Sequence, residues 1–306
     1  MTRIGILTSG HEHEDKRLED AAKSRGYDAK LLYLHRCSLS ICPHAPEVYY
    51  DGNPIAQDFD LIIPRVDTPH TEYGLTVLRQ FTSMHIFTSD DARALELGRD
   101  KIRCVQRLLR ENVPFPSTGF AHSKEDFDNI INTVGGVPLI IKVVEGTEGV
   151  GVFLADDMKH AVNLLKTFKQ LSTPLMVQKF IEESAGTDIR AFVIDGEVVA
   201  SMQRQSQDGD FRANVALGGG VESVTLSELE KEIAIKAAQA IKINVAGVDL
   251  IRSNQGPLVI EINVSPGFTG LEHVTGMDIA GKIVDYAVKA KHASSHSPVL
   301  NTDQCG

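Results

Sequence analysis

The chain has 306 residues, of which 42% are hydrophobic and 24% charged, and these proportions are ordinary for a soluble globular protein. The length allows two or three packed units. The formal net charge of −10, without any basic run, argues against nucleic acid as a partner. No apolar run reaches the roughly 20 residues that span a bilayer, and the N-terminus has no signal-peptide pattern, so we expect a cytoplasmic protein without membrane contact.

The first 92 residues alternate short apolar runs with helical stretches. The pattern predicts strands at residues 3–8, 29–35 and 60–64, and helices at residues 14–25 and 71–83. Strands that alternate with helices favour a parallel, Rossmann-like sheet. The first turn, Thr8–His11, has no G-x-G-x-x-G pattern, so the dinucleotide fingerprint is absent.

The rest of the chain has a different order of elements. Helices are predicted at residues 93–97 and 100–111, and Pro114 and Pro116 end the second one. Residues 117–172 predict strand, helix, strand, loop, strand and helix. More strands and two helices follow up to residue 290, one of these helices at residues 229–241. The Ser/His/Asn-rich residues 291–306 predict a flexible tail.

The most informative stretch places two carboxylates and an amide on one predicted hairpin. Two apolar-alternating runs, one on each side of a turn-forming cluster, predict antiparallel strands. If the turn centres on Gln255, Asp249 and Glu261 lie directly opposite each other, and Asn263 points to the same face. Oxygen ligands of this kind select Mg²⁺ or Mn²⁺. The alternative is an exposed hairpin whose acids contact only water.

A glycine loop follows a strand that carries Lys142. The loop contains Gly146, Thr147, Gly149 and Gly151 and leads into a second strand. Its backbone N–H groups could fold over phosphates, with the lysine reaching the same groups. A strand rather than a helix follows, so this is not a P-loop. A glycine-rich hairpin turn without a ligand is the alternative.

Two further segments carry cations. Asp100 and Lys101 open a helix, where the lysine either faces a site or lies on the surface. The long polar loop at residues 203–220 contains Arg204 and Arg212. Arginine is suited to bidentate contact with phosphate or carboxylate, although a solvated loop has the same composition.

Several motifs occur in one order along the chain and together resemble a known family. They are Gln178–Ile181, Gly186–Arg190, Asp210–Asn214, Val245–Asp249 and Glu261–Gly267. The chain resembles the ATP-grasp superfamily and, more narrowly, the RimK-type α-L-glutamate ligases, which add glutamate to the C-terminus of a small-subunit ribosomal protein. The resemblance implies an α/β chain: a Rossmann-like pre-ATP-grasp domain at residues 1–92, then an ATP-grasp domain at residues 93–290. Within the latter, it implies a lid subdomain at about 117–175 and a catalytic subdomain at about 176–290.

The resemblance assigns roles to matching positions. Lys101 and Lys142 look like the lysines that bind ATP, with the glycine loop above. Lys179 and Phe180 look like the adenine hinge, and Asp188 resembles the ribose contact. The residues that resemble the phosphate-contacting loop are Arg212, Ala213 and Asn214.

The same resemblance implies the chemistry. Asp249, Glu261 and Asn263 look like the ligands of two Mg²⁺ or Mn²⁺ ions. Arg204 and Arg212 are the expected catalytic arginines, with Arg204 facing an acyl phosphate. Arg65 is a further candidate for contact with glutamate or the acceptor.

Two positions depart from the family pattern. Lys179 stands where better-known members carry Glu, and Ala216-Leu217 stands where the family usually has His-Arg. We therefore expect an ATP- and metal-dependent ligase that adds glutamate to the C-terminal carboxylate of a ribosomal protein or peptide through an acyl phosphate. A ligase for an amino-acid carrier protein, a cofactor tail or a small peptide is one alternative, and a non-catalytic nucleotide-binding regulator is another. The family also implies a homo-oligomer, either a dimer or a tetramer.

Overall fold

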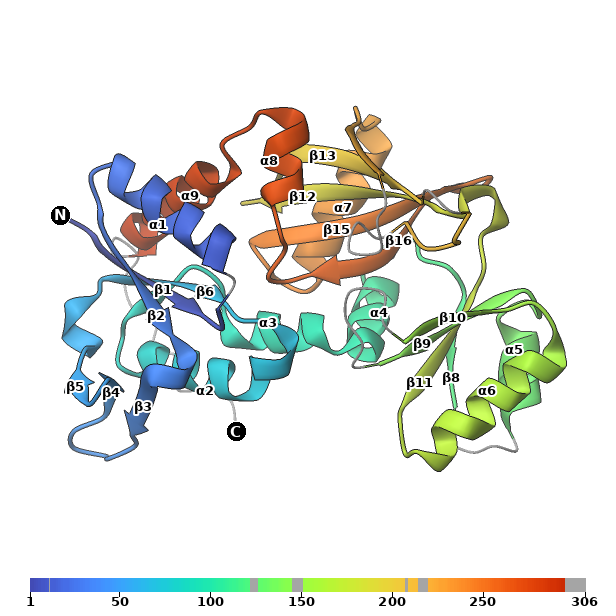
Figure 1. The fold of residues 1–306 in the computed structure, drawn as a ribbon, viewed down its shortest axis with the longest axis horizontal. Coiled ribbons are helices and arrows are strands. Elements are labelled where there is room, and N and C mark those ends of the chain that lie inside the picture. Colours follow the sequence, from blue (N-terminus) through green and yellow to red (C-terminus); the bar gives the residue numbers. More distant parts are fainter. Residues whose placement is uncertain (11, 122–125, 145–150, 207–208, 214–219, 295–306) are drawn as a thin grey trace. The chain divides into compact units, whose positions relative to one another are not determined.

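A computed structural model describes residues 1–10, 12–121, 126–144, 151–206, 209–213 and 220–294. The chain forms two compact units, one of residues 1–92 together with the chain from Asp278 onward, the other of Arg93–Met277 (Figure 1). No helix in the described part of the chain is both long enough and apolar enough to cross a membrane.

A parallel sheet forms the centre of the first unit, as the alternating pattern predicts. Its strands, in spatial order, are β2 (Asp28–Tyr33), β1 (Arg3–Thr8), β6 (Leu61–Arg65) and β7 (Phe87–Thr88). The helices of this unit are α1 (Glu12–Ser24), α2 (Thr71–Ser83) and α9 (Ile279–Ser294). The sheet and its helices have the Rossmann-like arrangement expected of this part of the chain.

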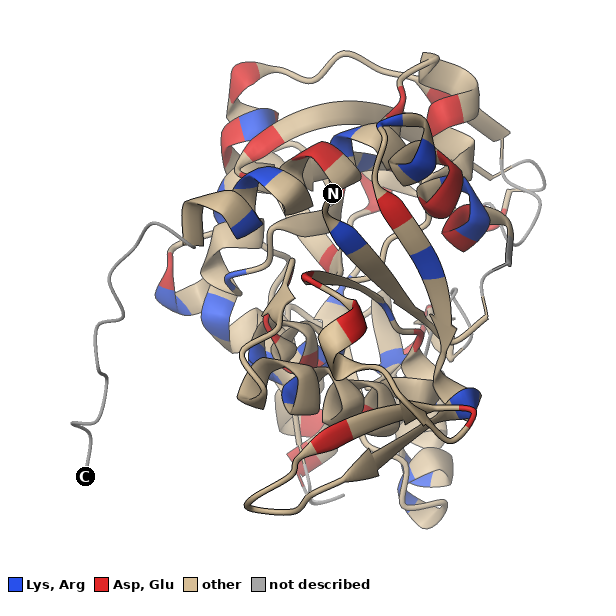
Figure 2. Cartoon of the chain, turned by 90° about the vertical axis from the view of Figure 1, so that its left-hand side faces the viewer, with Lys and Arg blue, Asp and Glu red and all other residues tan. Residues whose placement is uncertain are grey.

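Helix α9 lies with the first unit, whereas the resemblance implied that it belongs to the ATP-grasp domain at residues 93–290. It packs on α1 and contacts β6 and β7. The buried residues of α9, which include Ile283 and Val284, supply an apolar face for this contact. Figure 2 shows basic and acidic residues interspersed on these segments, and Arg25 Nε donates to Asp285 Oδ1 at 2.7 Å.

A small antiparallel sheet was not expected from the sequence. It consists of β3 (Cys37–Ser40), β4 (Glu47–Tyr50) and β5 (Asn53–Pro54). These strands have two to four residues each. So short a run gives too few alternating positions for the period of two to stand out.

The second unit contains two antiparallel sheets. The first has the order β10 (Val152–Ala155), β9 (Leu139–Val143), β11 (Leu175–Lys179), β8 (Thr118–Phe120). The second has the order β14 (Gly220–Ser223), β13 (Glu197–Gln205), β12 (Thr187–Ile194), β15 (Val245–Ser253), β16 (Gly256–Asn263). The helices are α3 (Ala92–Arg99), α4 (Lys101–Arg110), α5 (Phe127–Thr133), α6 (Met158–Gln170), α7 (Glu228–Ala240) and α8 (Thr269–Thr275).

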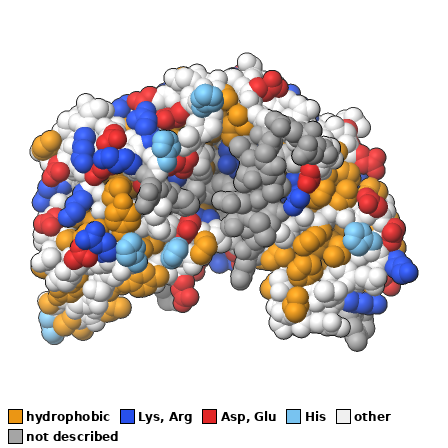
Figure 3. Space-filling model, viewed as in Figure 1, with side chains coloured by type: hydrophobic (Ala, Val, Ile, Leu, Met, Phe, Trp, Pro, Cys, Tyr) orange, Lys and Arg blue, Asp and Glu red, His pale blue; other side chains and the backbone are white. Residues whose placement is uncertain are grey.

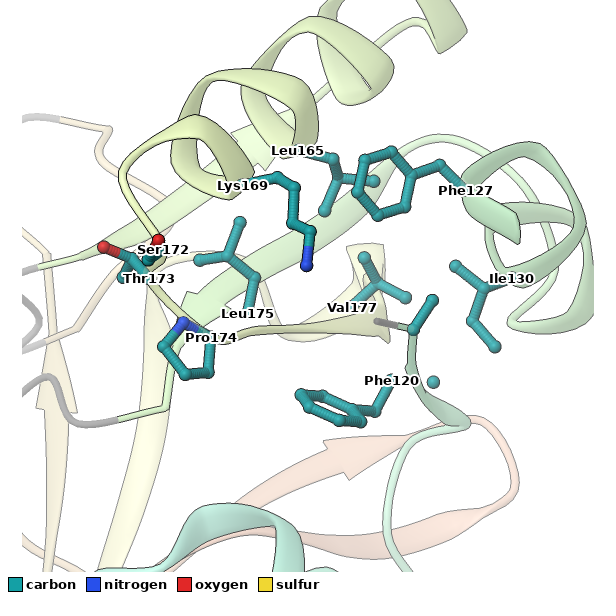
Figure 4. Close-up of a pocket in the computed structure, with 12 residues that line it drawn as sticks. Phe120, Phe127, Ile130, Leu165, Lys169, Ser172, Thr173, Pro174, Leu175 and Val177 are labelled. Carbon is teal, nitrogen blue, oxygen red and sulfur yellow. The ribbon is translucent and has the colours of Figure 1, made fainter. Parts of the chain in front are cut away.

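The first of these sheets packs on α5 and α6 and leaves a cavity of about 200 Å³ beside β8 and β11 (Figure 4). Phe127, Leu165 and Leu175 line it, and the Lys169 side chain extends into it. Figure 3 shows hydrophobic side chains exposed over this part of the second unit, at lower right. No carboxylate is among the lining residues, so this cavity lacks the oxygen ligands of a divalent ion.

The predicted hairpin is present as β15 and β16, with a β-bulge. Ser253 pairs with Gly256, so the turn has two residues rather than a centre at Gln255. That register alone would place Asp249 opposite Ile260. The register shifts by one residue between Asp249 and Leu250, and this shift brings Asp249 opposite Glu261. The predicted pairing is therefore confirmed, although an extra residue in β16 produces it.

Helix α3 packs closely on the loop after β16 at Gly98. A Cβ added there would overlap Val264 Cγ1. We expect Gly98→Ala to lower the free energy of unfolding by about 1–3 kcal/mol, because overpacking forces neighbouring atoms apart. Urea unfolding measures the change.

The matched control for this substitution is Gly270→Ala in α8. A Cβ at Gly270 would meet only Met202 Sδ, at 3.9 Å. We expect this control to be neutral or to stabilise the protein by up to about 1 kcal/mol, because alanine favours helix. Equal losses in the two variants would contradict the packing assigned to Gly98.

Candidate functional site

One face of the second sheet gathers charged side chains from four neighbouring strands. The register pairs Asp188 of β12 with Arg204 of β13, and Arg190 of β12 with Asp249 of β15. Glu261 of β16 lies next in the same row. Since side chains alternate along a strand, these five residues share one face. Helix α7 contacts β12, β13, β15 and β16.

Asp249 lies at the centre of this face and is 2% exposed. Arg190 donates to both of its oxygens, from Nε to Oδ1 at 2.8 Å and from Nη2 to Oδ2 at 2.8 Å. Arg204 Nη2 lies 2.9 Å from Oδ2. Burial favours the neutral acid, but the two guanidinium groups outweigh it and hold the pKa of Asp249 well below its usual range. The carboxylate is therefore ionised at neutral pH.

Arg204 and Asp188 form a second buried pair. Arg204 is 5% exposed and Asp188 is 8% exposed. Arg204 Nε donates to Asp188 Oδ1 at 2.6 Å, and Nη2 donates to Oδ2 at 2.7 Å. Burial lowers the pKa of Arg204, but the two nearby carboxylates outweigh this effect and raise the pKa above its usual value. Both carboxylate oxygens of Asp188, the predicted ribose contact, thus accept hydrogen bonds from Arg204 in this structure.

Glu261 and Asn263 present the more accessible oxygens. The Glu261 side chain is 42% exposed, and Lys101 Nζ lies 3.8 Å from its Oε1. Asn263 Nδ2 donates to Gly247 O at 3.2 Å and to Asp249 Oδ2 at 3.3 Å, which turns its amide toward the same carboxylate. Among the described residues no three His, Cys, Asp or Glu side chains gather as a metal site, and the third candidate ligand here is the amide of Asn263. These hard oxygen donors fit Mg²⁺ or Mn²⁺.

The two candidate nucleotide lysines come from different elements. Asp100 caps α4 by accepting hydrogen bonds from Ile102 N and Arg103 N, which fixes Lys101 in the first turn. Lys101 Nζ also donates to Val144 O at 3.4 Å. Lys142 lies on β9; burial lowers its pKa, while Glu261 acts in the opposite direction. A lowered pKa is typical of lysines in functional sites.

The glycine loop is described only at its end. Val143 N donates to Gly151 O at 2.8 Å, which closes the β9–β10 hairpin. Gly151 has φ +78°, and a Cβ there would lie 2.8 Å from Val143 Cγ2, so the position requires glycine. The candidates Gly146, Thr147 and Gly149 lie outside the described residues, as does Asn214.

The candidate hinge is joined to the candidate phosphate loop by an aromatic pair. The rings of Phe180 and Phe211 meet edge to face with their centroids 6.3 Å apart. Lys179, at the end of β11, is exposed, and its N–H donates to Ser117 O at 2.8 Å. Base recognition through the Lys179 N–H would therefore compete with this bond.

The phosphate loop itself is anchored at Gly186. Gly186 N donates to Phe211 O at 2.9 Å, and a Cβ at Gly186 would lie 2.8 Å from Asp210 O. Arg212 folds back on Asp210, with Nη2 2.7 Å from Oδ2, and Ala213 is 5% exposed. The guanidinium of Arg212 has further N–H donors beyond those bonded to Asp210, with which it could contact a ligand.

Two residues of interest lie outside the predicted set. Arg190 received no role from the motifs, although its position two residues after Asp188 on the same strand gives the signal that would find it. Ser265 Oγ, two residues after Asn263, is buried with no hydrogen-bond partner in the described part of the chain. Arg65, by contrast, is 3% exposed within the first unit and pairs with Glu14 at 2.8 Å.

Family models match nearly the whole chain. Residues 98–287 match the model described as RimK-like ATP-grasp domain, and residues 2–95 match the RimK PreATP-grasp domain. A protein of Legionella pneumophila (strain Corby) named probable alpha-L-glutamate ligase is 46% identical over 296 residues, covering 96% of this chain and 98% of that relative. A relative of the same name from Picosynechococcus sp. is 44% identical over 288 residues, covering 94% and 95%.

Solved structures share the fold at low sequence identity. The RimK domain protein ATP-grasp from Sphaerobacter thermophilus has a TM-score of 0.73 at 21% identity, covering 94% of this chain and 100% of that one. The ATP-grasp ligase PsnB, complexed with minimal precursor, has a TM-score of 0.74 at 20% identity, covering 95% and 99%. At this identity the likeness shows the ATP-grasp fold and nothing finer.

Proposed function

Because the chain belongs to the RimK-like ATP-grasp family, and is thus an ATP-dependent ligase that forms a carbon–nitrogen bond, we propose that it adds glutamate to the C-terminal carboxylate of a ribosomal protein or peptide. The observation that carries the proposal is the sheet face on which Asp249 and Glu261 lie opposite each other beside Arg190 and Arg204. The names of the relatives support glutamate as the amino acid.

In the proposed reaction an oxygen of the acceptor carboxylate attacks the γ-phosphorus of ATP, and the bond to ADP breaks. The amine of glutamate then attacks the acyl carbon of the acyl phosphate, phosphate leaves, and the amine gives up a proton. Two Mg²⁺ or Mn²⁺ ions, held by Asp249, Glu261 and Asn263, would supply positive charge to the phosphates.

The chain's own residues position and stabilise these groups. Lys101 and Lys142 bind phosphate oxygens, and Arg204 and Arg212 face the charge that develops on the transferring group. Lys179 and Phe180 offer backbone groups to adenine, and Asp188 lies at the ribose. Positioning and charge stabilisation together contribute on the order of 10 kcal/mol to the barrier reduction.

The proposal is tested by ADP release with ATP, Mg²⁺ or Mn²⁺, and glutamate, with and without purified ribosomal protein. Mass spectrometry of the acceptor then shows whether glutamyl residues were added. We expect turnover that requires glutamate and is lost in Asp249→Ala. Nucleotide binding without any glutamate-dependent turnover would overturn glutamate as the substrate and leave the ligase class standing.

A second acceptor class is favoured by one sequence observation. Ala216-Leu217 replaces the family's usual His-Arg and removes positive charge from the loop, although these residues lie outside the described part of the chain. An amino-acid carrier protein, a cofactor tail or a small peptide is then the acceptor. Membership of a ligase family removes support from the non-catalytic regulator considered above.

A further inference from the structure

Arg190 is bound directly to Asp249 and has no role in the motifs that point to the reaction. We propose that Arg190 is a resident cation for Asp249. It occupies both carboxylate oxygens while no divalent ion is bound, so that free divalent ions bind weakly and enter together with the nucleotide. The inference rests on the proposed function for the metal role of Asp249 and identifies Arg190 as a positioning residue.

The backbone register sets this contact. Arg190 and Asp249 are direct neighbours on the antiparallel strands β12 and β15. Such pairs have Cβ atoms about 4.5–5.5 Å apart, close enough for the guanidinium to reach across. The two hydrogen bonds, each of 2.8 Å, use the planar fork of arginine against both oxygens. A lysine could offer only a point charge here.

The stem of Arg190 also has a fixed path. A Cβ on Gly247 would lie 3.4 Å from both Cδ and Nε of Arg190, so glycine leaves room for the side chain to lie across β15. The Arg190 side chain is 14% exposed. A divalent ion approaching Asp249 therefore meets an ordered guanidinium rather than a solvated carboxylate.

Arg190 differs from Arg204 in how many carboxylates it contacts. Arg204 donates twice to Asp188 and shares Nη2 with Asp249, so it keeps an anchor if Asp249 binds another cation. Arg190 contacts no carboxylate other than Asp249 within the described ranges. The positive charge of Arg190 is thus paired with Asp249 until an anionic ligand, such as the phosphates of ATP, binds in the site.

Without a metal, cationic side chains already outnumber the carboxylates of the site. Four cationic side chains and three carboxylates share it: Arg190, Arg204, Lys101 and Lys142, with Asp188, Asp249 and Glu261. A free divalent ion finds no surplus of negative charge here. Once the phosphates of a nucleotide add negative charge and oxygen ligands, the ion becomes favourable.

The test measures Mn²⁺ binding to nucleotide-free protein by the electron paramagnetic resonance signal of free Mn²⁺. We expect Arg190→Gln to bind Mn²⁺ roughly tenfold more tightly than wild type, because a unit positive charge at contact distance has been removed and two oxygens freed. Adding ADP to wild type should raise its Mn²⁺ affinity by a similar factor. With ADP present, wild type and Arg190→Gln should therefore differ less in Mn²⁺ affinity.

Two control variants test whether the gain in Mn²⁺ affinity needs the release of the Asp249 oxygens. One removes a different cation from the site, and the other removes an arginine–carboxylate pair elsewhere. Lys142→Gln removes a cation from the same site but frees no oxygen of Asp249, so its gain should stay below about threefold. Arg252→Gln removes a bidentate partner of Glu230 at the other end of the hairpin and should leave Mn²⁺ binding unchanged. Should Arg190→Gln fail to fold by circular dichroism, Arg190→Lys, which gives up the fork, should still bind free Mn²⁺ more tightly than wild type.

Equal Mn²⁺ affinity in wild type and the Arg190 variants overturns the proposal, and so does an equal gain in Lys142→Gln. The measurement needs neither glutamate nor turnover. A chain that meets these expectations yet makes no glutamyl product therefore overturns the proposed function and leaves the role of Arg190 intact.

Discussion

Glu261→Gln should lower the rate of ADP release by about a thousandfold, while the free energy of unfolding changes by less than about 0.5 kcal/mol. Glu261 is a candidate metal ligand whose side chain is 42% exposed. Its substitution weakens the binding of the ion that would stabilise the reacting phosphates, and it does not disturb the core. Initial rates at saturating ATP and glutamate, together with urea unfolding of the same preparation, measure both quantities.

Glu222→Gln is the matched control for Glu261→Gln. Glu222 lies on β14 in the same sheet and accepts a hydrogen bond from Gln203 Nε2 at 3.1 Å. Its loss should leave both the rate and the stability unchanged. If Glu261→Gln retains most of the wild-type rate at saturating Mg²⁺ and Mn²⁺, Glu261 is not a metal ligand.

Arg204→Met should reduce both stability and activity. Asp188 and Asp249 are 8% and 2% exposed, and the substitution takes a shared guanidinium from both. Leaving a buried carboxylate without its partner costs about 3–5 kcal/mol. We expect a loss of this size in urea unfolding and at least a hundredfold loss in the rate of ADP release, because Arg204 also faces the developing charge.

Arg252→Met is the control for Arg204→Met. It shows what the loss of an arginine–carboxylate pair outside the candidate site does to stability and to the rate of ADP release. Arg252 is 53% exposed and pairs with Glu230 at 2.6 Å, remote from the candidate site. Glu230 is 3% exposed but keeps the hydrogen bonds from Ser227 N and Oγ. The loss of Arg252 should therefore cost about 1–3 kcal/mol, less than the loss of Arg204, and leave the rate unchanged. A double variant, Arg204→Met with Asp188→Asn, should recover part of the stability but not the rate. Recovery of the rate would mean that Arg204 acts only as a partner of Asp188.

The long elements were predictable from the sequence because their periodicity is strong. The strand at residues 3–8 and the helix at residues 71–83 occur with the predicted bounds. Helix α7 begins one residue before the predicted start, at Glu228, where Ser227 and Glu230 form a capping box. The hairpin pattern predicted that Asp249 and Glu261 lie opposite each other, and the register confirms that pairing.

Other features depend on tertiary contacts that periodicity does not reveal. The packing of α9 with the first unit follows from which surface its apolar face covers, and the small sheet of β3, β4 and β5 follows from pairing between short segments. The bond from Arg190 to Asp249 depends on strand order, which the local pattern leaves open. The number of metal ions, the choice of Mg²⁺ or Mn²⁺, and a dimer or tetramer stay predictions.

The β-bulge in the hairpin has a consequence for how the chain tolerates deletions. Ile260 is the residue by which β16 exceeds a regular ladder. At its present length, the hairpin without the bulge would place Ile260 opposite Asp249 and turn Glu261 to the other face of the sheet. Deleting Ile260 would instead move Glu261 into that place, so the two carboxylates would stay opposite each other in a continuous ladder. The carboxylate pair is therefore compatible with a regular hairpin that is one residue shorter, and the bulge accommodates the extra residue without separating the two acids.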